Sequence, residues 1–157
     1  MKKINIGIPQ ENLKKINAFL EALLADENVM YVKIKNFHWN VEGENFFEYH
    51  KFLDELAEET EKTSDEIAER MRTLGAKVQA SMKNYLAKTS LKEANTIQEE
   101  ADSMMEILLE DYESSCRVIR KVIESMEKLD DVGTADFLTG VLEAKEKRAW
   151  MLRSILG

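Results

Sequence analysis

The sequence predicts an all-α fold, a four-helix bundle with one long crossover. Its 157 residues include only one proline and six glycines, so few residues would interrupt helices. Leu, Ala, Glu, Lys and Met, which favour helices, are abundant. Hydrophobic residues make up 44% and charged residues 33%, as is typical of a globular protein, and we expect residues 1–157 to form a single domain.

The first helix is expected from Pro9 to about Trp39. Proline is favourable in the first turn of a helix, where its missing N–H needs no partner. Apolar residues then recur at helical spacing: Ile16, Phe19, Leu20, Leu23 and Leu24. The segment "NVEG" should end this helix.

The second helix is expected from Asn45 to Leu74. The Asn45 side chain could cap its first turn, and Glu48, three residues later, would close a capping box. Gly75 suits the C-terminal cap, which often requires a positive φ.

A long connection, residues 75–95, carries a short helical piece, "ASMKNYLAK", and is too long for a simple turn. A third long helix is expected to start near Thr96, with Glu99 completing a second capping box, and to end near "KLDDVG". A fourth should begin around Thr134 and reach the C-terminus. Four long helices with a crossover after the second describe a ferritin-like bundle.

Several classes of function are disfavoured by composition. The net charge of −8 repels polyanions and favours cations as partners. Phosphate-binding loops and Ser/His/Asp nucleophile patterns are absent from the sequence. Because the chain lacks an apolar run of roughly 18 residues and the apolar core of a signal peptide, we expect a cytoplasmic protein without a membrane span. The lone Cys116 agrees with a reducing compartment and is expected to be a core residue.

Candidate metal ligands form a polar stripe on the second helix: His50, Asp54, Asp65 and Glu69 fall within an arc of about 100°. The two ends of this stripe are far apart, because eleven residues of helix span about 16 Å. Ligands lie about 2 Å from the ion that they bind, so the His50 end and the Glu69 end of one chain cannot share a metal.

Two copies of this helix packed antiparallel about a two-fold axis would bring a histidine end to each carboxylate end. His38, near the end of the first helix, can stand at a similar height to His50. Two imidazoles and three carboxylates suit iron or another divalent transition metal. Neither histidine has a glutamate three residues before it, so the Glu-x-x-His pairs of a metal centre inside the bundle are missing, which favours the subunit boundary.

Simpler interpretations of these residues stay open. Thirty acidic residues make solvated acidic faces common in this chain, and Asp54, Asp65 and Glu69 could belong to one. His38, beside Trp39, could be an interior histidine whose hydrogen bonds are satisfied.

Three stretches, "HWNVEG", "FFEYHKFLDE" and "DEIAERMRTLG", resemble the signature of the Dps family, the ferritin-like mini-ferritins named as DNA-binding proteins from starved cells. The segments "LLEDYESSCRVIR" and "DDVGTADFLTGVLEAKEKRAWMLRSIL" also resemble that family's third and fourth helices. The resemblance implies a ferroxidase centre between two-fold-related subunits, with these ligands: His38, His50, Asp54, Asp65 and Glu69.

The same resemblance implies a hollow homo-dodecamer that oxidises Fe(II), with hydrogen peroxide preferred over dioxygen, and stores Fe(III) mineral. Trp39 would lie beside the site and could quench stray oxidising equivalents, although it could equally pack the helix end. Asp130, Asp131 and Asp136 resemble the acidic three-fold pore of the family. Helix capping and the helix dipole would explain these three aspartates equally well.

DNA binding is doubtful, because only eight residues with two lysines precede Pro9 and duplex binding depends chiefly on neutralising phosphates. A nucleoid protein that binds and physically protects DNA is therefore the alternative function. A helical scaffold without chemistry is a third, which the polar stripe disfavours.

Overall fold

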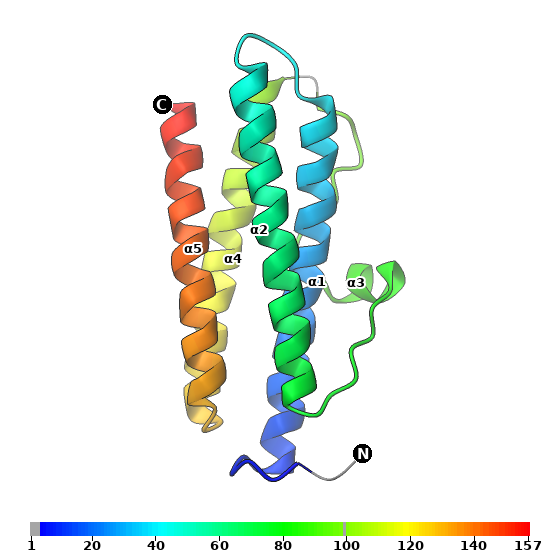
Figure 1. Ribbon diagram of the computed structural model, residues 1–157, viewed down its shortest axis with the longest axis vertical. Coiled ribbons are helices and arrows are strands. Elements are labelled where there is room, and N and C mark those ends of the chain that lie inside the picture. Colours follow the sequence, from blue (N-terminus) through cyan, green and yellow to red (C-terminus); the bar gives the residue numbers. More distant parts are fainter. Residues whose placement is uncertain (1–3, 99) are drawn as a thin grey trace.

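The computed structural model describes residues 4–98 and 100–157, and within these ranges it contains five helices and no strands. They are α1 (Gln10–Asn40), α2 (Phe46–Thr73), α3 (Met82–Lys88), α4 (Ala101–Lys128) and α5 (Val132–Leu156). The predicted all-α fold is confirmed: four long helices form a bundle, and the crossover between α2 and α4 carries the short α3 (Figure 1). Within the described ranges, none of the helices has the length and apolar character of a membrane span.

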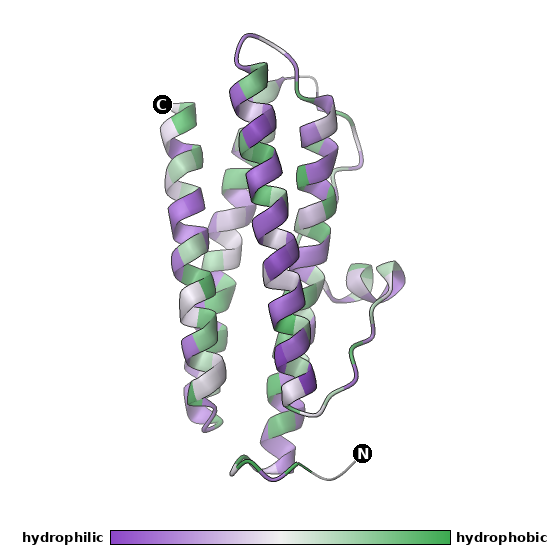
Figure 2. Ribbon diagram, in the orientation of Figure 1, coloured by the Kyte–Doolittle hydropathy of each residue, from purple (hydrophilic) through white to green (hydrophobic). Residues whose placement is uncertain are grey.

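The bundle consists of two antiparallel helix pairs. Helix α1 packs chiefly against α2, and α4 packs against α5. The crossover runs along the outside of α1, where α3 packs against α1 at the side of the bundle (Figure 1). The outward surface of α2 is mainly hydrophilic, while apolar residues turn toward the bundle interior (Figure 2).

Two apolar clusters fill the bundle, one in each half of its length. The first includes Ile16, Leu20, Ile67, Met71, Ile119 and Leu138. The second includes Ile34, Phe37, Leu53, Leu56, Met104 and Leu108. Each fully buried side chain of this size contributes about 1.5–3 kcal/mol, so these clusters hold the helices in register.

The two predicted caps of α2 have different outcomes. Gly75 has φ +86°, and the N–H groups of Gly75 and Ala76 donate to the carbonyls of Arg72 and Met71 at 3.0 Å each. This Schellman arrangement confirms the predicted C-terminal cap. The prediction of a capping box formed by Asn45 and Glu48 was wrong, because the Asn45 side chain makes no cap hydrogen bond. With φ −97° and ψ 22°, Asn45 is not in the extended conformation that an N-cap needs.

The predicted start of the third long helix was also wrong. That helix, α4, begins at Ala101 and not near Thr96, while Glu99 lies outside the described residues. Helix α3 lies midway along α1, so the chain after Lys88 must still extend to the end of the bundle where α4 begins, as Figure 1 shows. An extended residue spans about twice the length of a helical one, so a non-helical segment bridges this distance in fewer residues. Within this segment Leu91 anchors the chain to the second apolar cluster.

Candidate metal centre

His38 and His50 lie against each other across the turn between α1 and α2. Their rings are stacked, with centroids 3.8 Å apart and an interplanar angle of 23°. His38 Nδ1 is 3.0 Å from the His50 carbonyl oxygen, and His50 Nδ1 is 2.9 Å from the His38 carbonyl oxygen. The structure thus brings together the two histidines that the sequence analysis singled out.

These reciprocal hydrogen bonds determine which nitrogen of each ring can bind a metal. A carbonyl oxygen only accepts hydrogen bonds, so each Nδ1 must carry the hydrogen and donate it. In a neutral imidazole the other nitrogen, Nε2, then has a free lone pair. Backbone carbonyls orient metal-binding histidines in this way in many proteins. In its neutral form each ring therefore presents Nε2 as the nitrogen with which it could bind a metal.

Asp54 lies beside the histidines, one helical turn after His50. Its Oδ1 is 3.7 Å from His38 Nε2 and 3.1 Å from Lys35 Nζ. The hydrogen bond from Lys35 lowers the pKa of the Asp54 carboxyl, although partial burial opposes this shift. An ionised carboxylate and two imidazole nitrogens therefore occupy one corner of the chain surface. Sequence reasoning did not identify Lys35, since a lysine among many gives no distinguishing signal.

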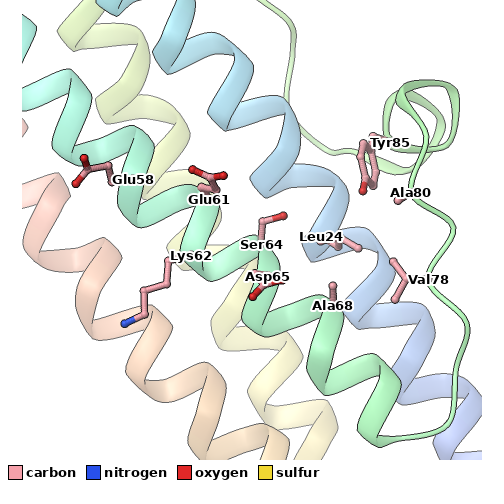
Figure 3. A pocket seen from close by; sticks show the side chains of 10 residues that line it. All are labelled: Leu24, Glu58, Glu61, Lys62, Ser64, Asp65, Ala68, Val78, Ala80 and Tyr85. Carbon is pink, nitrogen blue, oxygen red and sulfur yellow. The ribbon is translucent and has the colours of Figure 1, made fainter.

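Asp65 and Glu69 lie farther along α2, and both are exposed. Asp65 lines a groove with Ser64 and Ala68 of α2, bounded on its other sides by Leu24 of α1 and by Val78, Ala80 and Tyr85 of the crossover (Figure 3). Among the described residues, no group of three His, Cys, Asp or Glu side chains is arranged so that it could hold a metal ion within the single chain. The structure places Asp54 beside the stacked His38 and His50 without completing a metal site there, and it leaves Asp65 and Glu69 at a separate place.

Large apolar side chains are exposed around the histidine end. Trp39 is 72% exposed and Phe47 is 71% exposed, and Phe46 is partly exposed with its ring 5.1 Å from that of His50. Exposed aromatic residues grouped in this way mark surfaces that bind another protein more often than free surfaces. The expected packing role of Trp39 within its own chain is not supported, because its ring is mostly uncovered.

Comparison with known proteins places this chain in a family. A model of the ferritin-like domain matches residues 17–157. DNA protection during starvation protein 2 of Bacillus anthracis is 40% identical over 143 residues, covering 91% of this chain and 97% of the relative. The chain belongs to the Dps family of ferritin-like proteins. The resemblance noted from the sequence is thereby confirmed.

Solved structures of Dps proteins share the fold closely. The Dps protein of Vibrio cholerae, described as a member of a broad superfamily of ferritin-like diiron-carboxylate proteins, superposes with a TM-score of 0.93 at 30% identity, covering 100% of this chain and 98% of that chain. The Dps protein of Bacillus brevis gives 0.91 at 32% identity, covering 96% and 100%.

The three candidate pore residues differ in their surroundings. Asp130 and Asp136 are exposed, whereas Asp131 is 2% exposed. Asp131 accepts hydrogen bonds from the Thr134 backbone N–H at 3.0 Å and from Arg70 Nη2 at 2.8 Å. Asp131 therefore caps the N-terminus of α5, which is the alternative that the sequence analysis left open. Arg70 was missed, because its partner lies 61 residues away in the sequence.

Proposed function

We propose that this Dps-family protein is a ferroxidase and iron-storage mini-ferritin, assembled as a hollow homo-dodecamer. The observation that supports this best is the division of the candidate ligands between two places on α2. His38, His50 and Asp54 are the candidate ligands at one end, and Asp65 and Glu69 supply carboxylates at the other. An antiparallel partner about a two-fold axis would complete two equivalent sites.

Fe(II) is the substrate that this donor set suits. Imidazole nitrogens and carboxylate oxygens together favour divalent iron over the harder, oxygen-preferring Mg²⁺ and Ca²⁺. Three carboxylates also compensate the growing charge as Fe(II) becomes Fe(III). Two Fe(II) ions each give one electron to a molecule of hydrogen peroxide, whose O–O bond breaks to yield two hydroxide ions. Consuming both reagents in one step keeps them from forming hydroxyl radicals.

Storage as a mineral requires many ions to reach an enclosed space. The net charge of −8 on each chain attracts Fe(II) at long range. The exposed Asp130 and Asp136 are the candidates for an acidic entrance. Asp131 is not proposed to line it, because its carboxylate is engaged by Arg70 and Thr134.

Physical protection of DNA is the alternative function, and several relatives are named for DNA protection during starvation. Direct binding of duplex DNA by this chain is disfavoured by its negative charge. Removing iron and peroxide would protect DNA without contact. We expect no gel shift of duplex DNA with the purified assembly at neutral pH and physiological salt, and a clear shift would favour the alternative.

The proposed function is tested by loading the purified protein with Fe(II) without oxygen and then adding hydrogen peroxide. Formation of Fe(III) is followed by absorbance while particle mass is measured in parallel. His50→Ala/Asp54→Ala should abolish peroxide-driven oxidation above the rate of free Fe(II), with helix content unchanged. Lys121→Ala/Glu124→Ala, which alters two exposed residues of α4, serves as the control and should oxidise iron normally. Unchanged kinetics in the His50/Asp54 variant would remove this site assignment.

A further inference from the structure

A layer of polar side chains crosses the middle of the bundle, between the two apolar clusters. Each of the four long helices contributes to it: Glu27 from α1, Thr60 from α2, Tyr112 from α4 and Lys145 from α5. All four residues are buried, with Tyr112 and Thr60 each 2% exposed. The proposed ferroxidase site uses none of them.

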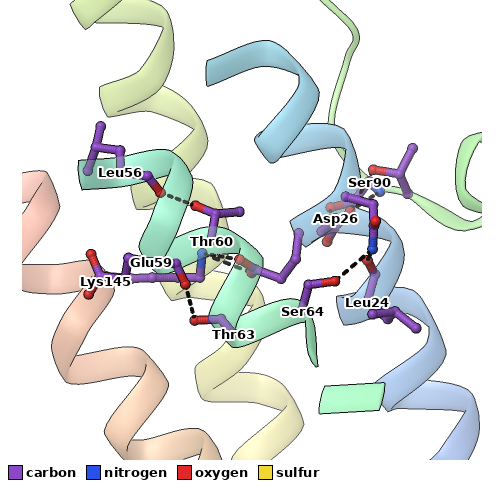
Figure 4. A network of polar contacts seen from close by, with 12 residues as sticks. Leu24, Asp26, Leu56, Glu59, Thr60, Thr63, Ser64, Ser90 and Lys145 are labelled. Carbon is purple, nitrogen blue, oxygen red and sulfur yellow. Dashed lines mark hydrogen bonds and ion pairs between the residues drawn. The ribbon is translucent and has the colours of Figure 1, made fainter. Parts of the chain in front are cut away.

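The ammonium group of Lys145 is held at the centre of this layer. Lys145 Nζ lies 2.8 Å from Glu27 Oε1 and 3.1 Å from Glu27 Oε2, and the two side chains are 6% and 3% exposed. The same nitrogen stands 5.1 Å from the centroid of the Tyr112 ring, over its face. Figure 4 shows Lys145 reaching from α5 into the space beside Thr60 of α2. One cation thus contacts both oxygens of a buried carboxylate.

Burial and neighbouring groups determine the charge of Lys145 and of Tyr112. Burial disfavours the ammonium, but the carboxylate of Glu27 outweighs it and holds the pKa of Lys145 above its ordinary value. Burial raises the pKa of Tyr112 to about 12, so its hydroxyl stays neutral. At physiological pH Lys145 is therefore an ammonium, and the Tyr112 hydroxyl is uncharged.

Ferritin-like di-iron proteins build their metal centres in the bundle core, from carboxylates and histidines that project inward from all four helices. In this chain the polar layer to which all four helices contribute is built around the Lys145–Glu27 ion pair, and neither histidine of the chain belongs to it. We propose that the Lys145 ammonium acts as a built-in cation, which occupies the coordination space of Glu27 and closes the bundle interior to metal ions.

The charges and donors explain how the layer would exclude a divalent ion. An entering ion would have to displace the ammonium from both oxygens of Glu27 while the positive charge remained tethered nearby, and repulsion between unit charges is strong in a poorly solvated interior. The remaining groups, the hydroxyls of Thr60 and Tyr112, are neutral and bind metals weakly. Lys145 would thus act as a residue that determines where on the chain metals bind, whether or not the proposed ferroxidase function holds.

Shortening Lys145 should convert this layer into a cation site. In Lys145→Ala the buried Glu27 carboxylate loses its partner, and leaving a buried charge uncompensated is strongly unfavourable. The space vacated by the ammonium borders both oxygens of the Glu27 carboxylate, which suit a hard cation such as Mn(II). Lys145→Ala/Glu27→Gln provides the matched control, because it opens the same space without the negative charge.

The test is crystallography of assemblies soaked in Mn(II), with anomalous scattering to locate the ions. We expect a peak beside Glu27 in Lys145→Ala and none in the middle of the bundle in the wild type or in the double variant. Peaks at the surface of the chain, including any at the proposed ferroxidase residues, do not bear on this result. A Mn(II) peak beside Glu27 in the wild type, or its absence from Lys145→Ala at saturating Mn(II), would overturn the proposal.

Thermal unfolding gives a second measurement in case Lys145→Ala crystallises poorly or is unstable. Mn(II) should raise the melting temperature of Lys145→Ala by more than it raises that of the wild type or of Lys145→Ala/Glu27→Gln, because only the single variant gains an interior site. Equal shifts in all three proteins, or failure of Mn(II) to restore folding to an unfolded Lys145→Ala, would contradict the proposal.

Discussion

Lys35 Nζ is 3.1 Å from the Asp54 oxygen that faces His38, so an ammonium group from α1 competes for a candidate metal ligand on α2. Replacing Lys35 with methionine keeps the length of the side chain and removes the charge. We expect Lys35→Met to bind Fe(II) a few-fold more tightly, because the metal no longer has to displace an ammonium group. Anaerobic calorimetry would measure the change.

The control for this variant is Lys51→Met, which removes an exposed lysine from α2 and should leave affinity unchanged. Weaker Fe(II) binding by Lys35→Met would mean that Lys35 positions the Asp54 carboxylate. The hypothesis that the Lys35 ammonium competes with Fe(II) for Asp54 would then be rejected.

The division of ligands between two chains can be tested by complementation. His50→Ala/Asp54→Ala and Asp65→Ala/Glu69→Ala should each be inactive alone, because every site in either homodimer lacks one half. When the two variants are unfolded together and reassembled in equal amounts, half of the dimers are mixed and each holds one complete site out of two. About one quarter of wild-type oxidation activity should return. Activity no higher than that of the separate variants would exclude shared sites.

Asp131 should matter for stability more than for iron entry. Asp131→Ala removes the cap of α5 and leaves Arg70 without its carboxylate partner, so we expect the free energy of unfolding to fall by about 2 kcal/mol. Asp136 is an exposed residue near the start of α5, and Asp136→Ala should change the free energy of unfolding by less than about 0.5 kcal/mol. Denaturant unfolding of the two variants compares them directly, and equal values would argue against the capping role.

Cys116 should resist chemical modification during turnover. Burial, reinforced by the Glu146 carboxylate, raises the pKa of the Cys116 thiol. Since the thiolate is the reactive form, its reaction with a disulfide reagent should begin at higher pH than that of a free thiol and be slower at neutral pH. Rates measured across a pH series, with glutathione as the reference, test this directly. Oxidation of Cys116 in the intact mass after peroxide turnover would contradict it.

Local patterns allowed most of the fold to be predicted from the sequence. Apolar spacing located the four long helices, and Gly75 marked the end of α2 because a positive φ there favours glycine. The start of α4 could not be predicted in this way. The length of the non-helical segment that follows Lys88 depends on where α3 packs against α1, and that position is set by contacts outside the segment.

Predicting the site had a similar limit. His38 and His50 are close in sequence and across a short turn, so their meeting could be inferred from spacing. The Lys145–Glu27 pair is 118 residues apart in the sequence, and one lysine among the 22 basic residues carries no sign of such a partner. In the proposed shared site Asp65 and Glu69 would act with a second copy of the chain, which no pattern within one sequence can locate.

The two histidine rings are oriented by peptide carbonyl oxygens, which every amino acid possesses. Neighbouring side chains can therefore be substituted, in evolution or in the laboratory, without changing the orientation of either imidazole ring. Neighbouring substitutions can alter the charge and shape of the approach to the proposed site, so its affinity and rate could change while the two Nε2 atoms keep their orientation.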